Sequence, residues 1–169
     1  MFRRISTLIF LASILFNVGG RLNAANDAAS PSLELRTEFA YEAIVEISAA
    51  VEVGETPKGH QRYIPITGGS FRGEKLQGIV LSGGADWQTD RSDGVTEVNA
   101  LYSIKCDDGT VVVVHNGGVI SEGGKYLRTA ARFEAPKGPH DWLNRAQFVG
   151  SISGGPRPGT VTIRIFRVL

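Results

Sequence analysis

Cysteine is almost missing from this chain, and its scarcity excludes a fold held together by disulfides. Cys106 is the single cysteine among 169 residues, so no disulfide can form within the chain. We expect Cys106 to be a small buried hydrophobe, with an intermolecular bridge as the alternative. A chain of about 150 residues buries roughly two-thirds of its unfolded surface, which is enough for a core without covalent cross-links.

The motifs of several enzyme classes are missing too. The sequence has no Gly-x-Ser-x-Gly nucleophile elbow and no phosphate-binding loop that ends in Gly-Lys-Ser or Gly-Lys-Thr. Its paired glycines do not open a helical pattern, which excludes a dinucleotide fingerprint. His60, His115 and His140 are too widely spaced to form a recognisable set of metal ligands. The sequence therefore predicts neither a cofactor nor a metal.

The N-terminus has the pattern of an export leader. Arg3 and Arg4 precede an apolar run over residues 5–18, and small residues follow up to Ala25. This order predicts a signal peptide over residues 1–24 with cleavage after Ala24. An apolar run of about 14 residues is shorter than the roughly 20 that span a bilayer, although an uncleaved anchor is the alternative. We expect an exported protein, periplasmic or secreted, with no stable membrane insertion after processing.

The charge balance argues against nucleic acid as a partner. The full chain has a formal charge of +1, and loss of Arg3, Arg4 and Arg21 with the leader changes it to about −2. No block of lysines and arginines is left in the mature chain, and its aromatic residues are not interleaved with basic ones. We therefore expect no nucleic-acid binding.

A period of two dominates the mature chain. Residues 25–32 are small and polar and are expected to form a flexible tail. From residue 33 to residue 48, apolar and polar residues alternate, which is typical of a strand with one buried face. The predicted apolar face comprises Leu33, Leu35, Thr37, Phe39, Tyr41, Ala43, Val45 and Ile47.

Glycine-rich segments separate further strand-like runs. Strands are predicted over about residues 61–71, 76–81, 95–106, 110–115, 126–134, 143–152 and 160–168, with a loop at 54–59 and an irregular stretch at 82–94. Asp108-Gly109 is a strong hairpin signal, and no segment of ten residues has helical spacing. Residues 33–169 therefore predict one all-β domain, an up-and-down antiparallel β-barrel of eight or nine strands, lipocalin-like in outline. A sandwich is the alternative, but a barrel closes the edges of long strands.

A series of short phrases resembles a known family. The phrases are VGETPKG at 53–59, PITGGSF at 65–71, GGADWQ at 83–88, DDG at 107–109 and WLN at 142–144. In this order they are similar to the bacterial and fungal domain-of-unknown-function family 3237, an uncharacterised protein family, over roughly Leu33 to Leu169. The resemblance implies a compact antiparallel β-barrel around a cavity, without a metal or cofactor signature and without a settled activity.

The chain also departs from the family pattern. Asn99-Ala100-Leu101-Tyr102 stands where a phrase like Asp-Ala-Arg-Tyr is expected after the Asp-Gly turn. The loss of a charge pair there puts in doubt any role that these positions have elsewhere in the family.

The segment GGADWQ is the first candidate site. Two glycines allow close approach of a ligand, Asp86 can accept a proton, Trp87 can stack on a ring and Gln88 adds an amide. The alternative is a bulged corner, in which Asp86 bonds backbone amides and Trp87 plugs one end of the barrel.

The strand predicted at 126–134 is the second candidate. Tyr126, Arg128, Arg132 and Glu134 share one face, which by default is a solvated stripe on the outside of the barrel. If the cavity is polar and this strand lines it, Tyr126, Arg128 and Glu134 offer an acid, a cation and a base.

Single polar residues complete the set of candidates. His115 and Asn116 are either a base with an oxyanion donor or merely the end of a strand. Tyr102 lies on an apolar face, where its hydroxyl needs a partner. Asn144 shares the predicted face of Trp142, which suits either a structural hydrogen bond or a ligand contact.

Three functions are compatible with these features. The first is a cofactor-independent enzyme of isomerase, cyclase or lyase type that moves a proton on an apolar or aromatic small molecule. Its catalytic candidates are Asp86, Tyr102, Arg128 and Glu134, and its ligand-binding candidates are Trp87, Gln88, Asn116, Tyr126, Trp142 and Asn144. The second is a ligand-binding protein without catalysis, and the third is an interaction module with a packed barrel. A carboxylate with a shifted pKa inside the cavity would favour the enzyme. A homodimer is compatible with all three.

Overall fold

The fold comes from a computed structural model, which describes residues 34–169. The predicted leader at 1–24 and tail at 25–32 lie outside the described residues. Within the described part, no helix is both long and apolar enough to cross a membrane.

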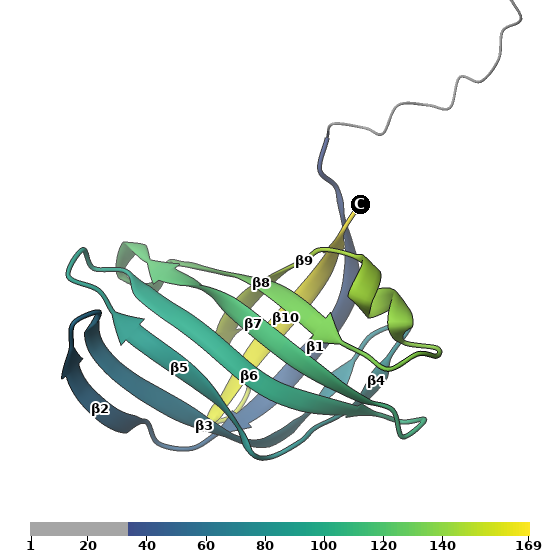
Figure 1. Ribbon diagram of the computed structural model, residues 1–169, viewed down its shortest axis with the longest axis horizontal. Coiled ribbons are helices and arrows are strands. Elements are labelled where there is room, and N and C mark those ends of the chain that lie inside the picture. Colours follow the sequence, from purple (N-terminus) through teal and green to yellow (C-terminus); the bar gives the residue numbers. More distant parts are fainter. Residues whose placement is uncertain (1–33) are drawn as a thin grey trace, which may run out of the picture. The chain divides into compact units, whose positions relative to one another are not determined.

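Ten strands and two short 3-10 helices form the described part of the chain (Figure 1). They are β1 (Thr37–Ile47), β2 (Val51–Thr56), β3 (Gly59–Arg72), β4 (Gln77–Val80), β5 (Gly84–Asp90), β6 (Thr96–Cys106), β7 (Val111–Ser121), η1 (Glu122–Gly124), β8 (Tyr126–Glu134), η2 (Asp141–Arg145), β9 (Phe148–Gly154) and β10 (Thr160–Val168).

The strands close into an antiparallel barrel. The sheet runs β1-β10-β9-β8-β7-β6, and β6 pairs with β4 and with β5. Both of these strands pair with β3, and β3 pairs with β1, which closes the circle. The barrel therefore has eight strand positions, because β4 and β5 occupy one position in succession and β2 pairs only with β3. The predicted all-β antiparallel barrel is confirmed.

The long strand β3 needs a glycine where it meets β1. Gly69 pairs with Val45 and has a φ of +135°, a conformation that favours glycine. A Cβ atom at Gly69 would lie 2.2 Å from the carbonyl oxygen of Ile44. Only a residue without a side chain allows β1 to approach β3 this closely.

One half of the barrel interior is packed solid. Aromatic rings meet there edge to face, with 5.6 Å between the centroids of Tyr41 and Phe71 and 4.9 Å between those of Phe133 and Phe148. Leu143 of η2 is buried in the same cluster, and η2 lies at this end beside β8 (Figure 1). The turn between β6 and β7 is also at this end, so we call it the η2 end. The turns β2–β3, β5–β6, β7–β8 and β9–β10 lie at the other end.

A β-bulge changes the predicted faces of β1. The pairing with β10 shifts between Phe39 and Tyr41, so Ala40 is an extra residue and the alternation changes phase. Tyr41, Ala43 and Val45 point inward as predicted, whereas Leu35 and Phe39 are exposed. The prediction of one continuous apolar face was wrong, because the extra residue of the bulge turns the side chains before it to the opposite face of the sheet.

Other differences concern short or glycine-broken strands. The loop expected at 54–59 is part of the β2–β3 hairpin, and the stretch expected to be irregular contains β5. The strand expected at 143–152 begins only at Phe148, because residues 141–145 form η2.

Candidate functional site

The second half of the barrel encloses a pocket of about 150 Å³. Its wall is mainly apolar and is formed by inward side chains of β1, β3, β6, β7, β8, β9 and β10, among them Val45, Ile64, Val98, Ile120, Leu127 and Ile163. Four polar residues also line it: Asp86, Gln88, Tyr102 and Asn116. A mainly apolar wall with a few polar groups is typical of a small-molecule site.

Asp86 is the ionisable carboxylate of this pocket. It projects inward from β5, with one oxygen accepting a hydrogen bond from the Asn99 backbone N–H at 2.9 Å and the other from the Gln88 side chain at 2.7 Å. Burial raises the pKa of Asp86 above its usual value. The two hydrogen bonds and the charge of Arg62 oppose this rise, but burial is the largest effect. A carboxyl group of this kind is suited to proton transfer.

A chain of polar contacts holds Gln88 and Asp86 in place. The Nε of Arg62 donates to Gln88 Oε1 at 3.1 Å, and the guanidinium of Arg62 also pairs with Asp90. Asp90 accepts a further bond from the Thr96 hydroxyl, and these contacts lower the pKa of Asp90, the bond from Arg62 most of all. The chain Asp90–Arg62–Gln88–Asp86 therefore orients the amide that contacts Asp86.

Several buried polar atoms in the barrel have no partner. Both atoms of the Asn116 amide group lack a hydrogen bond, although the residue is only 1% exposed. The hydroxyls of Tyr41 and Tyr102 influence each other's pKa, yet neither forms a hydrogen bond of good geometry. Burial raises the pKa of Tyr102 to about 12, so its hydroxyl keeps its proton. An unpaired buried polar group is unfavourable by about 1–3 kcal/mol, and a ligand group or water in the pocket would relieve this for Asn116 and Tyr102.

Small residues shape the space between these groups. Ala100 on β6 pairs with Asp86 on one side and with Asn116 on the other. Gly84 lies against Tyr102, where a Cβ would come within 2.5 Å of the tyrosine Cβ. The sequence suggested that a glycine pair here admits a ligand, but Gly84 instead admits the Tyr102 backbone and side chain.

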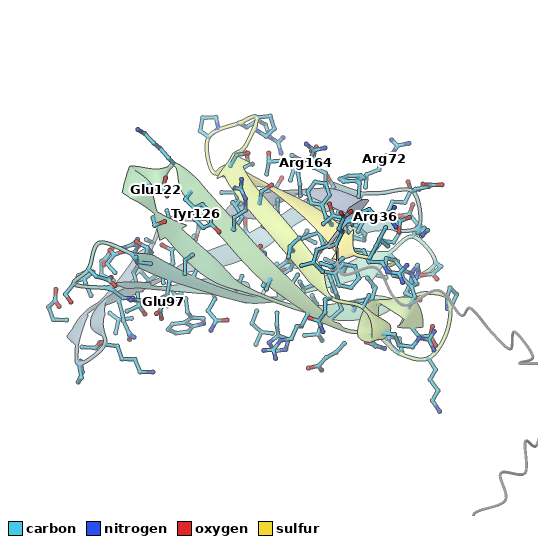
Figure 2. All side chains as sticks on the ribbon, turned by 90° about the horizontal axis from the view of Figure 1, so that it is seen from above. Arg36, Arg72, Glu97, Glu122, Tyr126 and Arg164 are labelled. Atoms are coloured by element: carbon cyan, nitrogen blue, oxygen red, sulfur yellow. The ribbon has the colours of Figure 1, made fainter. Side chains whose placement is uncertain are left out.

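Four other candidates point to the outside of the barrel. Trp87 stands between Asp86 and Gln88, so its side chain faces outward and packs on Tyr63 at 4.7 Å. Tyr126, Arg128 and Glu134 are exposed on the outer face of β8; Tyr126 is labelled in Figure 2 beside Glu122. The default interpretation of β8 as a solvated outer stripe therefore holds. The alternative in which Tyr126, Arg128 and Glu134 line the cavity was wrong, and so was the placing of Trp87 in a binding wall, because successive residues of a strand face opposite sides.

The same rule separates His115 from Asn116. Asn116 faces the pocket, whereas His115 lies on the outer face, with its Nε2 3.4 Å from a Glu134 oxygen. The two residues cannot serve one ligand, so the interpretation of His115 and Asn116 as a base with its oxyanion donor was wrong.

The last two candidates lie at the η2 end. Trp142 packs on Phe148 at 5.8 Å, below the Lys75 ammonium group. The Asn144 amide donates to the carbonyl of Ala135 at 2.8 Å and accepts from its N–H at 2.9 Å. Asn144 therefore makes a structural hydrogen bond, and neither residue lines the pocket.

Sequence reasoning missed Arg62 and most of the apolar wall. The missed signal was period two in the strand at 61–71, where Arg62, Ile64 and Ile66 share a face. A lone arginine among apolar residues on that face indicates an inward polar contact. The partner Asp90 could not be identified, because β5 was not expected to be a strand.

The fold and the pocket define the class of this protein: an antiparallel β-barrel that encloses a small, mainly apolar space with a few buried polar groups. A model of the family described as "Protein of unknown function (DUF3237)" matches residues 35–168. The chain belongs to this family, as the short phrases predicted.

Known proteins resemble this chain in sequence or in fold. A UPF0311 protein of Rhodopseudomonas palustris (strain TIE-1) is 33% identical over 138 residues, which cover 72% of this chain and 89% of that protein. The crystal structure of a beta-barrel-like protein from Acinetobacter baumannii AYE is 27% identical, with a TM-score of 0.74 and coverage of 83% of this chain and 99% of that one. An enzyme from Penicillium herquei has the same fold at 20% identity, with a TM-score of 0.67 and coverage of 83% and 98%.

Proposed function

We propose that this protein binds a small, mainly apolar molecule inside its barrel and that Asp86 exchanges a proton with it. The observation that carries the proposal is a carboxyl group with a raised pKa on the wall of an apolar pocket. A binding site alone needs only shape and a few hydrogen-bonding groups. A proton-transfer site needs a group whose pKa is moved toward the working pH.

The size of the pocket limits the ligand. An apolar pocket of about 150 Å³ holds a molecule of roughly benzene size, so the expected ligand is a single ring or a short branched chain. Its polar group is expected to be a carbonyl or hydroxyl, because the Asn116 amide offers both an N–H donor and an oxygen acceptor.

The proposed reaction needs no cofactor. Ionised Asp86 takes a proton from a carbon next to the ligand's carbonyl group, and the electron pair moves to the carbonyl oxygen. The Asn116 N–H stabilises the resulting enolate oxygen. Asp86 then returns the same proton to a different carbon, which isomerises the ligand.

A single-ring ketone tests this step. The probe is 3-cyclohexen-1-one, which becomes the conjugated 2-cyclohexen-1-one when the proton moves from C2 to C4 and is followed by ultraviolet absorbance. We expect Asp86→Asn to lower the rate by about 100-fold or more, as is usual for loss of a general base. The matched control Glu134→Gln, on the outer face, is expected to react at the wild-type rate.

Different outcomes separate the two parts of the proposal. Equal rates for wild type and Asp86→Asn remove the catalytic role of Asp86. Saturable binding of the probe by calorimetry, without turnover, leaves a ligand-binding protein. Absence of both binding and turnover, together with no small molecule in mass spectra of extracts of the purified protein, contradicts the whole proposal.

We further propose that the protein acts outside the cytoplasm. Support comes from Arg3 and Arg4, the apolar run and the small residues before Ala25. Mass spectrometry of the protein expressed at full length is expected to give a chain that starts at Ala25. A chain that starts at Met1 in the cytoplasmic fraction would overturn this localisation.

A further inference from the structure

A second group of reactive side chains lies at the η2 end, away from the pocket. Cys106 is the last residue of β6, Asp108 lies in the turn between β6 and β7, and His140 immediately precedes η2. The sulfur atom, a carboxylate oxygen and a ring nitrogen of these residues all lie within 4.8 Å of one another. Among residues 34–169, this is the one group of three or more such side chains close enough to share an ion.

The backbone around this group fixes its position. The Cys106 N–H donates to the Thr110 carbonyl at 2.8 Å, and the Gly109 N–H donates to the Cys106 carbonyl at 2.8 Å. One carboxylate oxygen of Asp108 accepts from the Thr110 N–H at 2.9 Å. Its other oxygen therefore faces His140, 3.1 Å from the Nε2 atom. The hairpin thus presents the thiol and the carboxylate from one rigid turn.

The histidine ring is held in a buried position with an unused nitrogen. His140 is only 8% exposed, and its carbonyl accepts from the N–H of the buried Leu143 at 3.1 Å. Its Nδ1 atom is buried and has no hydrogen-bond partner. Nε2, the ring nitrogen that faces Asp108, is the atom that can share an ion with that carboxylate.

The local charge favours a cation. Asp107 and Asp108 directly follow Cys106 in sequence, and no lysine or arginine among residues 34–169 forms an ion pair with either carboxylate. Gln77 contacts Asp107 only through its neutral amide, at 2.8 Å. A divalent cation would therefore enter a negative environment without displacing a basic side chain.

We propose that Cys106, Asp108 and His140 bind one Zn²⁺ ion, with water as the fourth ligand. Sulfur, nitrogen and oxygen donors in a tetrahedral arrangement suit zinc. The 3.1 Å between the His140 and Asp108 atoms is close to the separation that bonds of about 2.0–2.2 Å produce. The thiol loses its proton to solvent on binding. The ion would join the β8–β9 loop to the β6–β7 turn and stabilise the η2 end, independently of the pocket.

Cobalt substitution tests this site directly. The protein, treated with chelator and kept reduced, is titrated with Co²⁺. We expect one equivalent to bind, with the near-ultraviolet charge-transfer band of a cobalt–thiolate bond and the strong visible bands of tetrahedral Co²⁺, both removed by added Zn²⁺. His140→Ala is expected to weaken binding by about 100-fold or more, since even outer partners of metal ligands contribute 10–100-fold. His115→Ala, at the exposed histidine, is the matched control.

Two substitutions of Cys106 separate loss of the metal site from loss of the fold. Cys106→Ser and Cys106→Ala are both expected to lose the charge-transfer band while keeping the far-ultraviolet circular dichroism spectrum. If neither folds, the His140→Ala result and the melting temperature decide: Zn²⁺ should raise the melting temperature of wild type but not of His140→Ala. A wild-type protein without a saturable charge-transfer band, or equal cobalt affinity in His140→Ala, overturns the proposal.

Discussion

Asp86 and Asn116 stand two strands apart on the inner wall of the barrel, each paired with Ala100 on the strand between them. Neighbouring strands are about 4.8 Å apart, so the Cα atoms of Asp86 and Asn116 lie roughly 10 Å apart, and both side chains line the pocket. Only the methyl group of Ala100 projects from the intervening strand between them. The Asp86 carboxyl group and the Asn116 amide therefore border the same pocket, next to the small side chain of Ala100.

Filling that space should abolish binding while leaving the acid in place. Ala100→Leu puts three more carbon atoms into the pocket, and we expect it to remove binding of 3-cyclohexen-1-one in calorimetry. Because the added atoms enter existing space, the free energy of unfolding should change by less than the about 1–3 kcal/mol typical of overpacking. The matched control is Ala85→Leu, whose side chain lies on the outer face beside Asp86. Unchanged probe affinity in Ala100→Leu would show that ligands do not use this pocket.

Asn116 is expected to lower the stability of the empty protein. Its amide is buried without partners, so Asn116→Leu, which has a similar volume, should raise the free energy of unfolding by about 1–3 kcal/mol. Thr129→Val is the control, because the Thr129 hydroxyl is also buried without a partner but does not line the pocket. Urea unfolding should show both variants to be stabilised, and calorimetry should show that only Asn116→Leu loses the probe. A less stable Asn116→Leu would mean that ordered water satisfies the amide.

Asp86 should leave a signature in the pH dependence of stability. Because burial raises its pKa in the folded protein, the folded state binds more protons than the unfolded chain between the usual aspartate pKa and the raised one. The contribution of Asp86 to the free energy of unfolding therefore falls as pH rises through that window. Asp86→Asn lacks this contribution, so its unfolding free energy minus that of wild type should increase with pH across the window. A difference that is flat or decreases with pH would contradict the raised pKa.

Asn144 is expected to contribute to the free energy of unfolding but not to ligand binding. Its two hydrogen bonds to Ala135 join η2 to the end of β8, and their loss in Asn144→Ala should lower the free energy of unfolding by about 1–2 kcal/mol. Asn144→Asp keeps the acceptor but loses the donor, so it should fall between Asn144→Ala and wild type. Both variants should bind the ring ketone with wild-type affinity, and weaker binding would place Asn144 in the site.

The alternation of apolar and polar residues predicted the strands correctly wherever they were long and regular. The strands at Tyr126–Glu134 and Thr160–Val168 were predicted with the bounds that the structure has. β2 and β5 were missed because glycines and charged residues interrupt their patterns. The bulge at Ala40 could not be seen either, since an extra residue leaves the composition of a strand unchanged while reversing its faces.

The candidate site was predicted in part. Asp86, Gln88, Tyr102 and Asn116 meet in one pocket, as a barrel with a cavity implied. Trp87 and Glu134 were grouped with them because their chemistry suits a ligand, although their own strands turn them outward. The group of Cys106, Asp108 and His140 was overlooked for the opposite reason. Its members are separated in sequence by up to 34 positions, and only the course of the β8–β9 loop in the folded protein brings His140 to the β6–β7 turn.

The order of apolar and polar residues by itself determined that this chain forms antiparallel strands and favoured a barrel over a sandwich, and a series of short sequence phrases indicated its family. Alternation, turn signals and short phrases are all local features, because each involves residues that are close together in the sequence. The tertiary structure alone decided which polar groups meet, how far burial moves the pKa of Asp86 and where the interior stays hollow. Register, bulges and packing set these, because each depends on residues that are distant in the chain and close only after folding.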